Sequence, residues 1–284
     1  MEDLPSPVGV VGGGTMGAGI AHVFVAAGAE VTIVESDDDR VAAARDALER
    51  SLQGAADRGK LPEGTDVAGL VARTGVVTGV ANLPAGTGLV IEAVPERVDL
   101  KQEILASAAE RCPDAVLATN TSSLSVGAIG RDLPAGRLLG MHFFNPVPAQ
   151  RLVELIRPPG APDELVEQVR GWVEALGKTA IVVNDAPGFA TSRLGVAVGL
   201  EAIRMLEEGV ASAEDIDTGM ELGYRWPVGP LKLTDIVGLD VRLAIAEHLA
   251  EELGERFAPP QLLRDKVARG ELGKKSGQGF HRWE

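Results

Sequence analysis

A run of glycines near the amino terminus constrains the fold more than any other feature of this sequence. Gly12-Gly13-Gly14-Thr15-Met16-Gly17 follows the short apolar run Val8–Val11 and opens a segment with helical character. Glycines at the first, third and sixth positions allow a tight turn, a close approach of the backbone to a ligand, and close packing of helix on strand. Between a strand and a helix, this pattern indicates a dinucleotide-binding fold, with the pyrophosphate at the helix amino terminus.

An acidic residue follows where such a fold needs one. Glu35 ends the apolar run Val31–Glu35, about 20 residues after the glycines, where a carboxylate accepts hydrogen bonds from ribose hydroxyls. Because that carboxylate would repel a 2′-phosphate, the two motifs together predict NAD rather than NADP. FAD-binding proteins share the glycine pattern, so the glycines alone leave FAD open.

Short apolar runs alternate with amphipathic segments over the first two thirds of the chain. The expected strands are Val8–Val11, Val31–Glu35, Val76–Thr78, Leu89–Ala93, Val116–Thr119, Leu138–Phe143, Leu152–Ile156 and Thr179–Val183. The expected helices are Thr15–Ala27, Asp38–Arg58, Arg97–Arg111 and Pro162–Leu176, the last with Asp163 as its N-cap. This alternation predicts an α/β fold with a mostly parallel, doubly wound sheet.

The pattern of apolar residues changes after about Pro187, where strand-like runs end. The remaining segments are typical of helices: Leu194–Glu208, Ala213–Leu222, Pro230–Leu253 and Gln261–Arg269. We therefore expect two domains, an NAD-binding Rossmann-type domain over residues 1–186 and an all-α domain over residues 187–284.

The composition argues against several kinds of partner. A net charge of −14 disfavours binding to nucleic acid or to an anionic membrane surface. The stretch Val8–Ala29 carries no Asp, Glu, Lys or Arg, but its seven glycines argue against a membrane span, and the acidic residues Glu2 and Asp3 before it are unlike a signal peptide. Cys112 is the only cysteine, which excludes an intrachain disulfide and fits a reducing compartment, so we expect a cytoplasmic protein.

One histidine and one glutamate stand out as candidates for catalysis. His142 lies at the end of the apolar run Leu138–Phe143, and Glu154 lies inside Leu152–Ile156, where a carboxylate is costly without a partner. A hairpin around residues 145–150 would place them opposite each other. A carboxylate on an imidazole fixes its tautomer and stabilises the imidazolium, as a general base requires. From spacing alone, a structural histidine beside an edge-strand glutamate is an equal alternative, and His22, His248 and His281 are expected to be structural or exposed.

Several motifs in this order resemble the 3-hydroxyacyl-CoA dehydrogenase family, including its bacterial 3-hydroxybutyryl-CoA dehydrogenases. The resemblance covers nearly the whole chain. It rests on Gly12–Gly17, Ile91–Glu96, Asn120–Leu124, His142–Pro146, Asp185–Phe189, Asp215–Asp217 and Gly229-Pro230.

The resemblance implies roles for the matching residues. His142 resembles the catalytic base, Glu154 its carboxylate partner, Ser122 a serine that hydrogen-bonds the reacting 3-oxygen, and Asn145 an active-site asparagine. The cofactor contacts that the two motifs and the resemblance imply are Gly12, Gly14, Thr15, Met16, Gly17, Glu35, Ala93, Glu96, Lys101, Asn120, Ser122 and Asn145. No metal is implied.

The implied substrate contacts include two departures from the family pattern. Besides Ser122, Ser51 matches a serine that contacts coenzyme A, and Arg58 stands where the family often has lysine, which keeps the positive charge. Ser192 stands where well-known members have an active-site asparagine. Serine is shorter, so we expect its contact with substrate to be direct or through a bridging water, with packing alone as the alternative.

The resemblance predicts reversible oxidation of the 3-hydroxyl of a short-chain (S)-3-hydroxyacyl-CoA by NAD. A dehydrogenase of a free 3-hydroxy acid or sugar acid, and a non-catalytic NAD-binding protein, are the alternatives. Acyl chain length, a dicarboxylic substrate and the physiological direction stay open. The apolar runs Leu194–Ile203 and Leu231–Val241 exceed what one small helical layer buries, so we expect a homodimer through the C-terminal domain.

Overall fold

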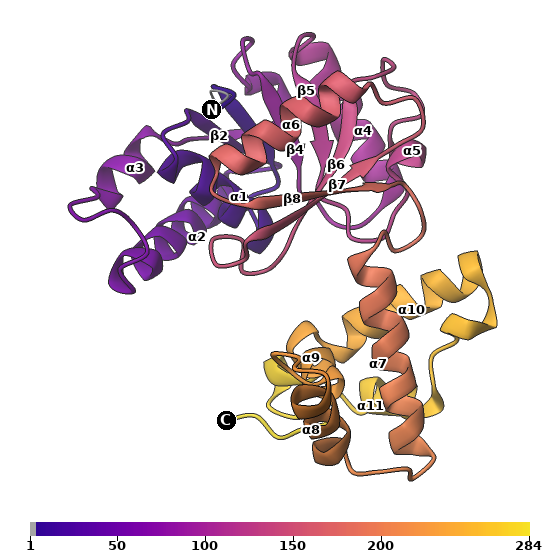
Figure 1. The fold of residues 1–284 in the computed structure, drawn as a ribbon. Helices are drawn as coiled ribbons and strands as arrows, with labels where there is room; N and C mark the ends of the chain where they lie inside the picture. Colours follow the sequence, from indigo (N-terminus) through magenta and orange to yellow (C-terminus); the bar gives the residue numbers. More distant parts are fainter. Residues whose placement is uncertain (1–3) are drawn as a thin grey trace. The chain divides into compact units, whose positions relative to one another are not determined.

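The computed structural model describes residues 4–284 and divides into two compact units. The first ends at Asp185 and the second begins at Ala186. The first contains the strands with their covering helices, and the second is helical (Figure 1). The expected α/β fold with a following all-α domain is confirmed.

An eight-stranded sheet forms the centre of the first unit, in the order β3-β2-β1-β4-β5-β6-β7-β8. The strands are β1 (Val8–Val11), β2 (Val31–Glu35), β3 (Gly75–Thr78), β4 (Leu89–Glu92), β5 (Val116–Thr119), β6 (Leu138–Phe143), β7 (Leu152–Arg157) and β8 (Thr179–Asn184). Strands β1 to β6 are parallel, β7 runs antiparallel to β6, and β8 is parallel to β7. The residues of β1 and β4 are all buried, as expected for parallel strands that are covered on both faces.

The helices of the first unit mostly match the amphipathic segments of the sequence. They are α1 (Thr15–Ala26), α2 (Asp38–Asp57), α3 (Val67–Arg73), α4 (Val98–Arg111), α5 (Val126–Ile129) and α6 (Asp163–Ala175), with a short 3₁₀ turn at Val80–Asn82. The expectation that Asp163 caps α6 was wrong, because Pro162 is the N-cap and Asp163 already belongs to the first turn. A carboxylate in a first turn still stabilises a helix through its dipole.

The second unit consists of α7 (Thr191–Glu207), α8 (Ala213–Gly223), α9 (Pro230–Val237), α10 (Leu239–Leu253) and α11 (Gln261–Ala268), with 3₁₀ turns at Glu255–Phe257 and Lys274–Ser276. The expected single helix Pro230–Leu253 was wrong. Gly238 adopts a φ of +105°, which no α-helix accommodates, so one helix ends there and the next begins.

Two buried aspartates hold the carboxyl-terminal segment on these helices. Asp235 accepts hydrogen bonds from the Phe280 and His281 backbone N–H groups and from Trp283 Nε1. Asp217 accepts the N–H groups of Leu231 and Lys232 at the start of α9 and lies 2.8 Å from His281 Nε2. His281 therefore has a structural role.

The stretch without charged residues, Val8–Ala29, forms β1, the glycine turn and α1, and contains Ile20 and Phe24 among its fully buried side chains. Within residues 4–284, no helix is long and apolar enough to cross a membrane.

Candidate active site

A cavity of about 560 Å³ lies at the carboxyl ends of β1, β2 and β4. β1 lies between β2 and β4, so the strand order reverses there, and open α/β sheets bind ligands at such a position. The cavity is lined by Val11, Gly12, Gly14, Thr15, Met16, Val34, Glu35, Ser36, Arg40, Gly79, Val80, Ala93, Val94, Pro95, Leu100 and Ile104. It therefore brings six of the predicted cofactor-contacting residues together.

The glycine turn has the geometry that the sequence motif requires. Gly12 has a φ of +94°, and a Cβ there would lie 2.8 Å from the Ala93 carbonyl oxygen. A Cβ on Gly17 would lie 1.7 Å from the Gly12 carbonyl oxygen, so α1 can approach the turn only through a glycine. Around Gly14 there is open space, and no side chain caps the start of α1. The helix amino terminus is thus open to an anionic group.

Gly13 has a steric role that the motif does not require. A Cβ there would lie 2.4 Å from the Ala44 Cβ of α2. Its backbone N–H donates to Glu35 Oε1 at 2.5 Å, and Glu35 Oε2 accepts a 3.3 Å bond from Ser36 N–H. The Glu35 carboxylate is consequently fixed at the cavity wall, where it can accept from ribose hydroxyls.

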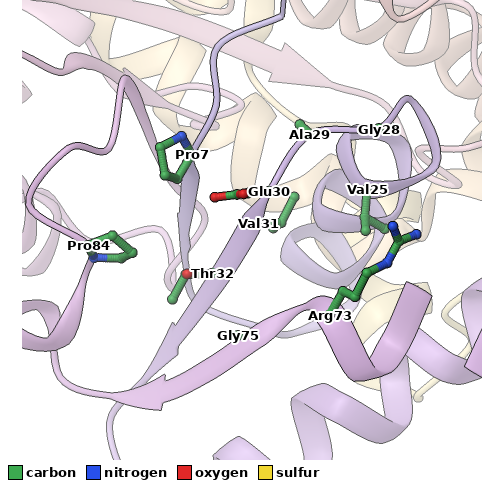
Figure 2. A pocket seen from close by; sticks show the side chains of 10 residues that line it. All are labelled: Pro7, Val25, Gly28, Ala29, Glu30, Val31, Thr32, Arg73, Gly75 and Pro84. Carbon is green, nitrogen blue, oxygen red and sulfur yellow. The ribbon is translucent and has the colours of Figure 1, made fainter. Parts of the chain in front are cut away.

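A second hollow of about 520 Å³ lies at the opposite ends of the strands, near the starts of β2 and β3 (Figure 2). Its charged side chains are Glu30 and Arg73, beside Pro7 and Pro84. Ligands of doubly wound sheets bind at the carboxyl ends of strands, so this hollow is on the wrong edge for the cofactor.

His142 and Glu154 form a buried pair across the antiparallel strands β6 and β7. The two residues are directly opposite in the register, and His142 Nδ1 lies 3.1 Å from Glu154 Oε2. His142 is 5% exposed and Glu154 is 0% exposed. The hairpin expected from the sequence is confirmed. An ionised carboxylate only accepts hydrogen bonds, so Nδ1 carries the hydrogen and Nε2 has the lone pair of a base.

Other predicted residues lie at neighbouring strand ends. Asn120 and Ser122 follow β5, and Asn145 is exposed in the turn after β6. The Asn120 side chain accepts the Phe143 backbone N–H at 2.9 Å and so joins the ends of β5 and β6. Ser192 belongs to the other unit, where it is half-buried in the first turn of α7.

Glu92 is a buried carboxylate at the end of β4 to which the sequence reasoning assigned no role. Its oxygens lie 2.8 and 3.1 Å from Lys101 Nζ and accept from Thr119 Oγ1 at 2.6 Å and from Val94 N–H at 2.7 Å. The signal for it was present, because a carboxylate inside an apolar run needs a partner, as with Glu154. Burial raises the pKa of Glu92, and the Lys101 ammonium opposes that effect.

Lys101 connects this pair to the turn after β5. Lys101 is 1% exposed and lies 3.2 Å from Glu96 Oε2. Glu96 Oε1 accepts from Thr121 Oγ1 at 2.6 Å and from the backbone N–H groups of Ser122 and Ser123 at 2.9 and 3.2 Å. Burial alone would raise the pKa of Glu96, but Lys101 and these hydrogen bonds lower it. Three predicted site residues thus belong to one network.

The family models decide the identity of this fold. The NAD binding domain of 3-hydroxyacyl-CoA dehydrogenase matches residues 7–186, and the C-terminal domain of the same enzyme matches residues 188–283. The chain belongs to the 3-hydroxyacyl-CoA dehydrogenase family. This confirms the resemblance found in the sequence, NAD as the cofactor and NAD-dependent oxidoreduction as the reaction class.

Named relatives are similar to this chain over its full length. A 3-hydroxybutyryl-CoA dehydrogenase of Mycobacterium tuberculosis is 41% identical over 288 residues, which cover 99% of both chains. Among solved structures, M. tuberculosis FadB2 has a TM-score of 0.93 at 40% identity and covers 99% of this chain and 100% of its own. The (S)-3-hydroxybutyryl-CoA dehydrogenase PaaH1 of Ralstonia eutropha has a TM-score of 0.91 at 38% identity, with the same coverage.

Of the two predicted coenzyme A contacts, Ser51 lies on α2 and Arg58 directly follows it. Ser51 is half-buried, and its Oγ is 2.8 Å from Nδ1 of His22, which is only 3% exposed on α1. Arg58 is exposed just after α2. Burial, helped by the positive charges of Lys178 and Arg58, lowers the pKa of His22 to about 4. His22 is therefore neutral at pH 7.

The lowered pKa of His22 predicts that the folded protein becomes less stable in acid. Because the pKa of His22 falls from 6.5 to about 4 on folding, the unfolded chain binds this proton more readily. The stabilisation is complete above pH 6.5 and is lost as the pH falls towards 4. In urea titrations, the free-energy difference between wild type and His22→Gln should shift by about 2 kcal/mol between pH 7.5 and pH 5, to the disadvantage of wild type.

The matched control is His248→Gln, which changes a half-buried histidine on α10. Between pH 7.5 and pH 5, the free-energy difference between wild type and His248→Gln should change less than that between wild type and His22→Gln. Parallel pH curves for wild type and His22→Gln would contradict the assignment of this acid sensitivity to His22.

Proposed function

We propose that this protein reversibly oxidises the 3-hydroxyl of short-chain (S)-3-hydroxyacyl-CoA thioesters, with 3-hydroxybutyryl-CoA as its characteristic substrate. The names of its full-length relatives from M. tuberculosis and R. eutropha support this substrate class. The observation that carries the proposal is the buried His142–Glu154 pair, because alcohol oxidation needs a base at the hydroxyl.

The cavity at the switch point suits the dinucleotide. Gly12, Gly14 and the amino terminus of α1 would hold the pyrophosphate, with Thr15, Met16 and Gly17 forming the first turn, and Glu35 would hold the ribose. When bound, NAD supplies the hydride acceptor, while the protein orients the reacting atoms.

His142 is the proposed general base. With its hydrogen on Nδ1 directed to Glu154, the imidazole accepts the proton of the 3-hydroxyl at Nε2. The resulting imidazolium is stabilised by the Glu154 carboxylate, which is 0% exposed and therefore weakly screened by water. In the reverse reaction, the same imidazolium returns the proton to the 3-oxygen.

The other predicted residues complete the proposed site. Ser122 would donate a hydrogen bond to the 3-oxygen, beside Asn145, and Ala93, Glu96, Lys101 and Asn120 would form the wall on the cofactor side. Ser51 and Arg58 would contact coenzyme A, where the Arg58 guanidinium suits a phosphate. Ser192 would contact the substrate directly or through water, as expected from the sequence.

Removing the base tests the proposal. His142→Ala should lower kcat for acetoacetyl-CoA reduction by NADH about 10²-fold or more, because loss of a general base or acid acts on the transition state. Glu154→Gln should lower kcat about tenfold, because its amide does not stabilise the imidazolium by charge. NADH consumption measures both rates, and NADH binding should stay within about threefold of wild type.

The control is His248→Ala, which removes a histidine from the helical unit and should keep the wild-type kcat. Near-normal turnover of His142→Ala would remove His142 from the mechanism. A wild-type protein that reduces a free 3-oxo acid faster than acetoacetyl-CoA would instead favour the free-acid alternative.

A homodimer through the helical unit is the second part of the proposal. Of the large apolar side chains exposed among residues 4–284, Val182 belongs to the first unit, whereas the helical unit has Leu194, Val210, Leu222, Tyr224, Ile236, Val237 and Val241. Apolar surface of this kind favours association. The single, buried Cys112 suits the cytoplasm, which we retain as the proposed location.

Light scattering at micromolar concentration should therefore give twice the chain mass of 29.6 kDa. Val241→Glu should shift the protein towards the monomer, because it places a charge among exposed apolar side chains. Val182→Glu, at the edge of the sheet, is the matched control and should leave the mass unchanged. A wild-type mass near that of one chain would refute the dimer.

A further inference from the structure

Two charged side chains line the NAD cavity, and they have opposite signs. Among the described residues that line it, Glu35 is the one carboxylate and Arg40 the one cation. Glu35 ends β2, and Arg40 lies in the first turn of α2. The remaining lining residues are apolar or uncharged, so these two side chains carry the charges of the cavity wall.

Glu35 is held rigidly in a position that disfavours a second phosphate. Both of its oxygens accept backbone N–H groups, from Gly13 at 2.5 Å and from Ser36 at 3.3 Å. A fixed carboxylate accepts hydrogen bonds from ribose hydroxyls and repels a 2′-phosphate. The position therefore selects NAD over NADP by repulsion.

Arg40 has the opposite effect, because its positive charge attracts a 2′-phosphate. Its only ion pair within residues 4–284 joins Nε to Asp37 Oδ2 at 3.5 Å, and the two side chains are 66% and 53% exposed. Exposed pairs of this kind contribute little to stability, so Asp37 does not hold the guanidinium tightly. Asp37 is itself engaged as the N-cap of α2, accepting the Arg40 backbone N–H at 2.9 Å. The guanidinium can therefore exchange this partner for a stronger one.

A 2′-phosphate is such a partner. Guanidinium presents planar, paired donors that match phosphate oxygens, and a dianion binds it more strongly than one exposed carboxylate does. In dinucleotide-binding folds, an arginine near the end of the second strand is the group that accommodates the 2′-phosphate of NADP. Arg40 stands in that region, five residues after the acidic position.

We propose that Arg40 is a specificity-determining residue that gives this NAD enzyme a latent site for 2′-phosphorylated dinucleotides. Glu35 is the main obstacle to that site, and Arg40 is the group that would bind the phosphate. The wild-type protein then discriminates against NADPH less strictly than Glu35 alone would dictate. This inference concerns the cofactor and does not depend on which acyl thioester is the substrate.

The test is a double-mutant cycle of dinucleotide binding, measured by fluorescence titration of the full chain with NADH and NADPH and no thioester. Glu35→Gln should strengthen NADPH binding about tenfold or more, since it removes the repulsion. Arg40→Gln should weaken NADPH binding about tenfold and change NADH binding less than about threefold. The double variant should bind NADPH no more tightly than wild type does, because the group that would hold the phosphate is then absent.

Arg45→Gln is the matched control, because it removes the same charge from the exposed side of the same helix outside the cavity. It should leave NADPH binding within about twofold of wild type. The proposal is overturned if the double variant binds NADPH as tightly as Glu35→Gln does, or if Arg45→Gln weakens NADPH binding as much as Arg40→Gln does. Because no substrate is present, failure of the substrate proposal would leave this result unaffected.

Discussion

The antiparallel pairing of β6 with β7 is the constraint on which the catalytic half of the site depends. Strands β1 to β6 all run in the same direction, so the reversal at residues 145–150 is a local event with a defined register. That register places His142 against Glu154 with almost no access for water. A shift of one residue would turn one of the two side chains to the other face of the sheet. The hydrogen bond at 3.1 Å is thus a product of strand pairing and cannot be formed by either strand alone.

The cofactor half depends on close backbone approaches instead. The turn at Gly12 and the contact of Gly17 with its carbonyl oxygen bring α1 to the end of β1. Behind that edge, the Glu92–Lys101 pair and Glu96 fix the turn that contains Ser122. A buried ion pair contributes little net stability, but losing one partner is costly, so such a pair is well suited to hold a turn in one conformation.

The sequence predicted the features that follow from local periodicity or from a fixed pairing rule. Most strand and helix ends agreed to within one residue, although α7 begins at Thr191 and was expected to begin at Leu194. The midpoint of the β6–β7 turn was enough to place His142 opposite Glu154. The short helix α3 and the four-residue α5 lack enough turns to show a helical period. Gly238 was overlooked because the apolar pattern continues on both sides of it.

The spacing of residues in the sequence could not predict side-chain contacts between separate helices and strands. The bond between His22 and Ser51 joins two helices across 29 residues, and nothing in either segment specifies that pairing. Lys101 was predicted as a site position by resemblance, but its enclosure by Glu92 and Glu96 depends on how α4 packs beside β4. Side-chain networks of this kind follow from tertiary packing, which a one-dimensional pattern does not encode.

In the proposed reaction His142, oriented by Glu154, accepts and returns the proton of the 3-hydroxyl. The most direct measurement is a crystal structure of the full chain with NAD and acetoacetyl-CoA, a pair that cannot react because both partners are already oxidised. If His142 is the base, the 3-oxygen should lie within about 3 Å of its Nε2, with Nδ1 still on Glu154. A bound thioester whose 3-oxygen contacts another proton-transferring side chain, with His142 out of hydrogen-bond range, would contradict that role.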